Sequence, residues 1–258
     1  MNRREVENLE RAERGVVRPE RLPAAFRRIA PTGAAAGYVR WWWYSEWDLP
    51  LGHTSDQEIL AFPSFNVVIE PGRAGISGPT STMATKSLSG TGWAVAALLQ
   101  PGVVPHLINS PAEAIDRYLV IDEPHLVKAV TAARNHAPLE AWLSARVGAL
   151  SSEAENANQI LHLAESDPDV HSVEQWAWAA NVSRRSLHRL TRKYIGLTPA
   201  AVIRRRRIQD ACFLLRSEVD LPIAEIAIRC GFTDHAHFTN EFRQTCLVTP
   251  SGYRRSRS

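Results

Sequence analysis

The pattern of hydrophobic and polar residues changes once along the chain, near residue 110. Before that point, short apolar and aromatic runs alternate with turn formers such as Pro71-Gly72 and Pro101-Gly102. Short runs bounded by Gly, Pro and Ser are typical of strands in a small β-barrel or sandwich. The predicted strands are Tyr38–Trp47, Ile59–Phe62, Phe65–Glu70, Gly75–Gly78 and Trp93–Gln100.

From Pro111 onward the pattern predicts helices. In Leu139–Leu150 the apolar positions recur at helical spacing and form one stripe. This stripe packs either on the β-rich part of its own chain or on a second copy, and both alternatives stay open. As the seam of a homodimer it would offer Trp142, Leu143 and Leu150.

These patterns predict an α+β fold in three parts, with a boundary at Asp167-Pro168-Asp169. Residues 1–30 are charged and mixed in sign, and we expect a flexible or loosely docked arm. Residues 31–165 are expected to form a small β-barrel or sandwich with following helices, and residues 166–258 an all-helical domain.

The last third contains an internal repeat at an offset of 50 to 51 residues. Val173–Ser183 matches Ile223–Thr233, and each copy ends in a Thr-Pro pair, at Thr198 and Thr249. Each copy combines a short helix, a turn residue suited to a left-handed conformation and a capping hydroxyl, which predicts a helix-turn-helix. The turn residues are Asn181 and Gly231, and the expected caps are Ser183 and Thr233.

The second helix of the first copy has two different faces. Leu187, Leu190 and Tyr194 lie on one side, whereas arginines and a histidine lie on the other. Such a helix suits the major groove of DNA. The segment Arg204–Arg216 predicts a long helix between the two copies, and its Arg204–Arg206 run fits either a solvated face or phosphate contacts.

Residues of about 170–256 resemble the DNA-binding domain of AraC/XylS-type transcription regulators. The resemblance is carried by Ile223–Ala227, Cys230–Asp234, His237-Phe238, Phe242-Arg243 and Val248–Arg255, with Gly196–Pro199 in the first copy. Thr191 stands where the family usually has Phe, and Leu247 where it usually has Gly. The resemblance implies two helix-turn-helix units joined by a linker helix, which bind double-stranded DNA.

The resemblance also implies the residues that face DNA. The first recognition helix would contribute Arg184, Arg185, His188 and Arg189, with Arg192 beside them, and the second Asp234, His235, Ala236 and Thr239. Arg243, Arg254 and Arg255 would contact phosphates. The charge agrees, because residues 1–165 carry 15 basic against 18 acidic residues, whereas residues 166–258 carry 15 against 9.

The N-terminal region resembles a cupin-like sensor domain through Leu60–Pro63, Ile76–Pro79 and Leu98–Gly102. Its tryptophans Trp41, Trp43 and Trp93 are candidate effector-binding residues, against the alternative that they form the core. Alternation predicts Trp41 and Trp43 on one face and Trp42 and Tyr44 on the other.

No catalytic site, cofactor or metal site is predicted, because His53 and His106 stand alone and no phosphate-binding or nucleophile motif occurs. The expected function is sequence-specific transcription regulation. The alternatives are a cupin-type sugar- or metal-dependent enzyme with an added DNA-binding module, and a DNA-organising protein without sequence preference. A small-molecule effector and RNA polymerase are further candidate partners.

Cellular location follows from cysteine usage and hydropathy. Cys212, Cys230 and Cys246 form no CxxC pair, and buried packing is the expected role. No apolar run approaches the roughly 18 residues that a membrane span needs. We therefore expect a cytoplasmic protein that makes no use of a membrane.

Overall fold

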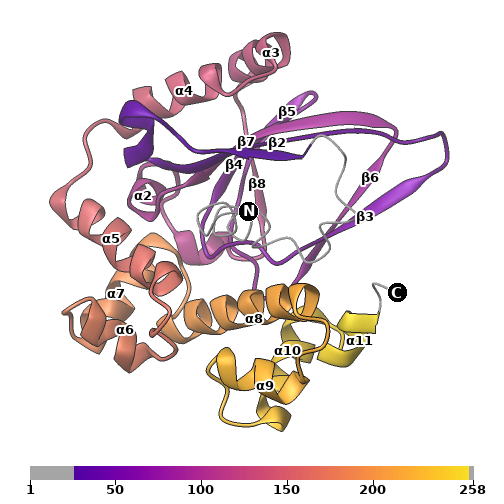
Figure 1. Ribbon diagram of the computed structural model, residues 1–258. Coiled ribbons are helices and arrows are strands. Elements are labelled where there is room, and N and C mark those ends of the chain that lie inside the picture. Colours follow the sequence, from indigo (N-terminus) through magenta and orange to yellow (C-terminus); the bar gives the residue numbers. More distant parts are fainter. Residues whose placement is uncertain (1–25, 256–258) are drawn as a thin grey trace.

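The computed structural model describes residues 26–255, in which a strand-rich part is followed by a helical part (Figure 1). This order confirms the predicted α+β fold. Of the predicted arm, residues 1–25 lie outside the described residues. Arg27–Ile29 are not part of an arm but form the edge strand β1, which pairs with β2.

The strands form a six-stranded antiparallel sheet and a separate two-stranded ribbon. The sheet has the order β1-β2-β7-β4-β5-β8, and the ribbon pairs β3 with β6. The strands are β1 (Arg27–Ile29), β2 (Val39–Asp48), β3 (Thr54–Ile59), β4 (Asn66–Glu70), β5 (Arg73–Ser77), β6 (Ala84–Ser89), β7 (Thr91–Leu99) and β8 (Tyr118–Ile121).

One face of the sheet carries the main core of the N-terminal part. Alternation along β2 places Trp42 and Tyr44 on this face, as predicted, where helices α3 and α4 cover them (Figure 1). The helices of this part are η2 (Gly33–Gly37), η3 (Pro101–Val103), α2 (Val104–Leu107), η4 (Pro111–Ala114), α3 (Pro124–Ala133) and α4 (Ala137–Val147).

Two strand predictions need correction. The segment after Pro111 was expected to be helical throughout, but Tyr118–Ile121 is strand β8, paired with β5. The ribbon strands β3 and β6 are largely polar, and of their residues the predicted strands include only Ile59. The rest of the predicted strand Ile59–Phe62 lies outside any strand. The pairing of β3 with β6, Gln57 with Lys86 for example, satisfies the backbone without an apolar face.

The helical part contains two cores, one for each helix-turn-helix unit. The helices are α5 (Ser152–Ser166), α6 (Val173–Ala179), α7 (Arg184–Tyr194), α8 (Pro199–Ser217), α9 (Ile223–Arg229), α10 (His235–Cys246) and α11 (Pro250–Arg255).

Helix α5 belongs to the first of these cores. Its residues Ala157 and Ile160 pack with Trp176 of α6, whose indole N–H donates to the carbonyl oxygen of Ile160 at 2.8 Å. The boundary expected at residue 166 therefore lies at the C-terminal end of α5, and this helix packs with the first helix-turn-helix unit. The long helix α8 lies between the two units (Figure 1).

Candidate nucleic-acid interface

The first helix-turn-helix unit consists of α6, a tight turn and α7. Asn181 in the turn has φ of 50°, the left-handed conformation predicted for it. Ser183 caps α7, as predicted, by accepting a hydrogen bond from the backbone N–H of Ser186 at 3.1 Å. Leu187, Leu190 and Tyr194 are buried and fix the inner face of α7.

The outer face of α7 carries the basic side chains that the sequence placed there. All five predicted residues of this helix are exposed: Arg184, Arg185, His188, Arg189 and Arg192. They lie on one strongly basic helix whose N-terminal end is capped and open to solvent. A helix of this kind can offer guanidinium groups to base edges and phosphates.

The second unit repeats this arrangement in α9 and α10 with one change. Gly231 takes φ of 74° in the turn, matching Asn181. The predicted cap Thr233 is wrong: Asp234 is the capping residue and accepts from the backbone N–H of His237 at 2.7 Å. The second turn is one residue longer, so the position equivalent to Ser183 is Asp234, at an offset of 51.

The predicted contact residues of α10 differ in how they are placed. His235, Ala236 and Arg243 are exposed. Thr239 is half-buried, and its hydroxyl has no hydrogen-bond partner among the described residues. The carboxylate of Asp234 is committed to the helix cap, and these backbone hydrogen bonds hold its pKa below the ordinary value.

The C-terminal arginines also differ. Arg255 is exposed. Arg254 is half-buried, and its guanidinium donates to the carbonyl oxygen of Leu221 at 2.7 Å. Arg254 thus ties α11 to the segment before α9, a structural role that charge alone did not indicate.

Acidic side chains from neighbouring helices contact the basic face of α7. Glu174 of α6 pairs with Arg184 at 2.9 Å. Glu153 of α5 pairs with Arg189 at 2.5 Å and also with Lys193. These two cations lower the pKa of Glu153 to about 2. Neither Glu153 nor Lys193 was among the predicted site residues, because their meeting depends on how α5 packs on α7.

The four consecutive arginines of α8 correct the expectation for the Arg204–Arg206 run. They are not a uniformly solvated face, because Arg204 is exposed whereas Arg205 and Arg206 are buried. Arg205 and Arg206 are 4% and 7% exposed. Each of the four side chains holds a different element of the fold, because successive positions on a helix point in different directions.

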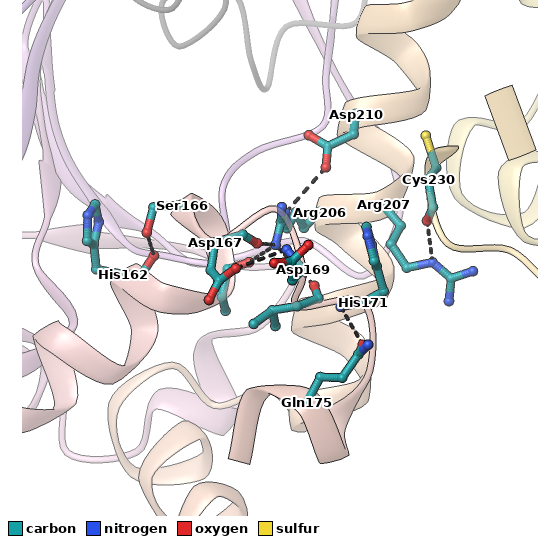
Figure 2. A network of polar contacts seen from close by, with 12 residues as sticks. His162, Ser166, Asp167, Asp169, His171, Gln175, Arg206, Arg207, Asp210 and Cys230 are labelled. Carbon is teal, nitrogen blue, oxygen red and sulfur yellow. Dashed lines mark hydrogen bonds and ion pairs between the residues drawn. The ribbon is translucent and has the colours of Figure 1, made fainter. Parts of the chain in front are cut away.

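Two of these arginines hold the turns of the helical part (Figure 2). Arg206 donates from Nη1 to the carbonyl oxygens of Ala164, Asp167 and Val170, at 2.5 to 3.1 Å, and so closes the end of α5. Arg207 donates to the carbonyl oxygens of Cys230 and Gly231, at 2.9 and 2.7 Å. Its guanidinium also lies 3.7 Å from the ring centre of Phe232.

The other two arginines face α10 and the N-terminal part. Arg204 pairs with Glu241 of α10 at 2.7 Å. Arg205 donates to the carbonyl oxygen of Ala61 at 3.1 Å and to the hydroxyl and carbonyl oxygens of Thr80. The linker helix is therefore fixed both to the second recognition helix and to two loops of the β-rich part.

Three further contacts extend the junction between the β-rich part and the second unit. Gln209 donates to the carbonyl oxygen of Leu60 at 2.8 Å, and the backbone N–H of Met83 donates to the carbonyl oxygen of Thr245 at 2.8 Å. The side chain of Leu60 is buried in the core of the second unit. The β-rich part thus completes the core on which α10 packs.

The predicted effector residues do not line a common pocket. Trp93 is buried in the core under α3 and α4, where Arg134 lies 4.5 Å from the centre of its ring. Trp43 lies on the opposite face of the sheet with Val68 and donates to Asn66 at 3.0 Å. Trp41 is half-buried. The packing alternative accounts for Trp93, and the sheet separates it from Trp43.

The predicted dimer seam is wrong in its central residue. Leu143 is fully buried in the core of its own β-rich part. Trp142 and Leu150 are half-buried and pack against the same core. Of the two alternatives left open for this stripe, the structure has the intramolecular one.

This arrangement defines a protein with two helix-turn-helix units, a class of fold that carries recognition helices for DNA. Residues 176–256 match the family model described as a helix-turn-helix domain. They form a helix-turn-helix domain, in agreement with the two units predicted from the sequence. Residues 27–120 match a second family model, described as a domain of unknown function (DUF6597).

Among curated proteins, the chain is similar to the HTH-type transcriptional activator RhaS of Escherichia coli. The two are 32% identical over 132 residues, which cover 49% of this chain and 47% of the relative. The chain thus matches about half the length of this relative. By its name, this relative is a transcriptional activator.

Two solved structures are also similar to parts of the chain. The C-terminal domain of AraT from Geobacillus stearothermophilus is 26% identical, covers 41% of this chain and 88% of that chain, and has a TM-score of 0.37. ToxT from Vibrio cholerae is 12% identical, covers 83% of this chain and 98% of that chain, and has a TM-score of 0.44.

Two further findings for residues 26–255 concern metal binding and membranes. In this range no three His, Cys, Asp or Glu side chains lie close enough together to hold a metal ion. None of its helices is both long and apolar enough to span a membrane.

Proposed function

We propose that the chain is a sequence-specific, DNA-binding regulator of transcription. The observation that carries the proposal is the pair of helix-turn-helix units, with α7 exposing Arg184, Arg185, His188, Arg189 and Arg192 on one face. Phosphate contacts would set the register of these units on the duplex, and contacts to base edges would select the sequence.

We assign unequal roles to the two recognition helices. Helix α7 would supply most of the electrostatic affinity, since its exposed face is rich in arginine. On α10 the exposed His235 and Ala236 would contribute through fit, with Thr239 beside them and Arg243 on phosphate. Asp234 would orient α10 as its cap, and Arg255 would add a phosphate contact.

We further propose that residues 31–165, whose strand-rich section precedes α5, sense a signal, either a small molecule or the formation of a homodimer. Support comes from the junction at Arg205 and Leu60, through which a change in the β-rich part would reach the second unit. Contact with RNA polymerase and action in the cytoplasm fit the same proposal. The name of the RhaS relative, a transcriptional activator, agrees with it.

The test is selection of bound duplexes from a random DNA pool, followed by titration of the selected duplex with wild-type protein, Arg185→Ala and Arg189→Ala. We expect one enriched motif and a loss of about 1–3 kcal/mol for a variant that removes a bidentate base contact. Equal binding to selected and scrambled duplexes would instead favour a DNA-organising protein without sequence preference.

A further inference from the structure

Glu153 occupies an unusual place for an acidic residue, beside the basic face of the first recognition helix. It lies in the first turn of α5, outside the helix-turn-helix motif, and its carboxylate binds Arg189 and Lys193 of α7. Arg189 contacts Oε1 at 2.5 Å, and Lys193 contacts Oε2. The hydroxyl of Tyr194 donates to Oε2 at 3.4 Å.

Glu153 occupies a position beside α7 in which a DNA phosphate could bind the same two cations. Arg189 and Lys193 are four residues apart, so they lie side by side on α7. One carboxylate bridges both, with charge-assisted hydrogen bonds of the type that Arg and Lys make to phosphate oxygens. One negative charge of the protein itself is therefore shared between two cations of the α7 face.

Other cations on the same helix are not held in this way. Among residues 26–255, Arg185 and Arg192 have no ion-pair partner, and both are exposed. The basic face of α7 is thus divided into the open Arg185 and Arg192, Arg184 paired with Glu174 of α6, and the two cations that Glu153 holds. The division does not follow from the composition of α7 but from the position of α5.

The position of α5 depends in turn on the β-rich part. The side chain of Asn158 accepts a hydrogen bond from the backbone N–H of Gly102 at 2.6 Å. At the other end of α5, Glu165 pairs with Arg40 of β2. The helix that carries Glu153 is therefore attached to the β-rich part at two points, in η3 and in β2, as well as to α7 through the first core.

We propose that Glu153 is a built-in competitor of DNA phosphate, which occupies Arg189 and Lys193 in the free protein and must release them when α7 enters the major groove. The proposal rests on the proposed function. It gives the β-rich part a route to the first unit, because any displacement of α5 on the sheet changes how tightly Glu153 holds the two cations.

The test compares Glu153→Gln with Glu155→Gln. Both variants remove one negative charge from the same turn of α5. Glu155 is exposed, and within residues 26–255 it makes no ion pair with α7, so its variant removes the charge without removing a contact to α7. Each protein is titrated, over a range of salt concentrations, with a duplex that wild-type protein has selected from a random pool. Thermal unfolding midpoints verify that both variants fold.

We expect Glu153→Gln to bind about 3- to 10-fold more tightly than Glu155→Gln, the range that two exposed ion pairs can supply. Its plot of log affinity against log salt should steepen by about one unit, since Arg189 and Lys193 become free to displace counterions. In the background of Arg189→Ala the gain from Glu153→Gln should shrink, because one partner is already absent.

Equal binding by the two variants, or weaker binding by Glu153→Gln, would overturn the competitor role; weaker binding would make Glu153 a positioning residue for Arg189 instead. The wild-type titration separates this failure from failure of the proposed function. If wild-type protein selects no duplex and binds none above background, the regulator proposal itself falls. If it binds and the two variants agree, only the competitor role falls.

Discussion

The guanidinium of Arg205 on α8 donates to both the hydroxyl and the carbonyl oxygen of Thr80, which lies 125 residues earlier in the chain. The side chain is 4% exposed, and burial lowers its pKa to about 10. Its hydrogen-bond acceptors are backbone carbonyls and a hydroxyl rather than a carboxylate. A buried cation held in this way fixes the linker helix on the β-rich part, because separating the two would leave the buried charge without these acceptors.

Arg205→Ala should therefore lower the free energy of unfolding by about 2–4 kcal/mol, since it removes packing and leaves the carbonyls of Ala61 and Thr80 without a donor. Urea unfolding followed by fluorescence measures the change. The control is Arg185→Ala, an exposed arginine, whose effect should stay within about 0.5 kcal/mol. Equal midpoints for the two variants would mean that the junction adds nothing to stability.

Leu247→Gly should stabilise the protein by up to about 1 kcal/mol. Leu247 ends α10 with φ of 61°, a left-handed conformation that costs a β-carbon-bearing residue energy but suits glycine. Its side chain is 64% exposed, so little burial is lost. The thermal midpoint should rise, and Leu247→Ala, which keeps the β-carbon, should give no such gain.

Gly196→Ala should have the opposite effect at the equivalent position of the first unit. Gly196 has φ of 82°, and a β-carbon there would lie 2.6 Å from the carbonyl oxygen of Pro111 in η4. Both the left-handed backbone and this contact oppose the change, and we expect a loss of about 2–4 kcal/mol in urea unfolding. A loss below about 1 kcal/mol would show that η4 can move away without cost.

The helix-turn-helix part could be predicted closely, because its information is local. A cap such as Ser183, a left-handed turn residue such as Asn181 and the alternation of inward and outward residues on α7 all lie within about twenty residues. The main strands β2, β4 and β7 could be predicted for the same reason, since each contains a short apolar or aromatic run. The face assignments along β2 followed from alternation alone.

What the sequence could not reveal depends on contacts between distant segments. Arg205 and Arg206 are indistinguishable from solvated arginines until the loops near Thr80 and the end of α5 are placed against α8. Glu153 becomes a partner of Arg189 only through the packing of α5. The polar ribbon β3–β6 was missed because its strands lack an apolar signature. The dimer seam at Leu143 was wrongly predicted, because an apolar stripe does not indicate which surface packs on it.

The three cysteines should not react with thiol reagents in the folded protein. All are buried, and burial raises the pKa of Cys230 to about 12. The hydrogen bond with Cys212, together with burial, raises the pKa of Cys246 well above its ordinary value. Because the thiolate is the reactive form, a chromogenic disulfide at neutral pH should label no cysteine in native protein and all three in denaturant. The sulfur atoms of Cys212 and Cys246 lie 3.8 Å apart, so rapid disulfide formation with diamide would contradict this prediction.

His136, in the segment between α3 and α4, should make the stability of the β-rich part depend on pH. Its ring stacks on Trp42, with 4.6 Å between ring centres, and shares a hydrogen bond with the hydroxyl of Tyr44. Burial lowers the pKa of His136 below the ordinary value of 6.5, although Glu140 acts in the opposite direction. The folded state therefore favours the neutral ring.

Because the unfolded chain takes up a proton at higher pH than the folded protein, lowering the pH below about 6.5 should stabilise the unfolded state and reduce the free energy of unfolding. Above that pH the ring is neutral in both states and contributes no slope. Urea midpoints at about pH 7.5 and about pH 5.8 should thus differ for wild-type protein and differ less for His136→Gln. The control is His53→Gln, an exposed turn residue; if it flattens the profile as much as His136→Gln does, the pH dependence does not arise from the ring stacked on Trp42.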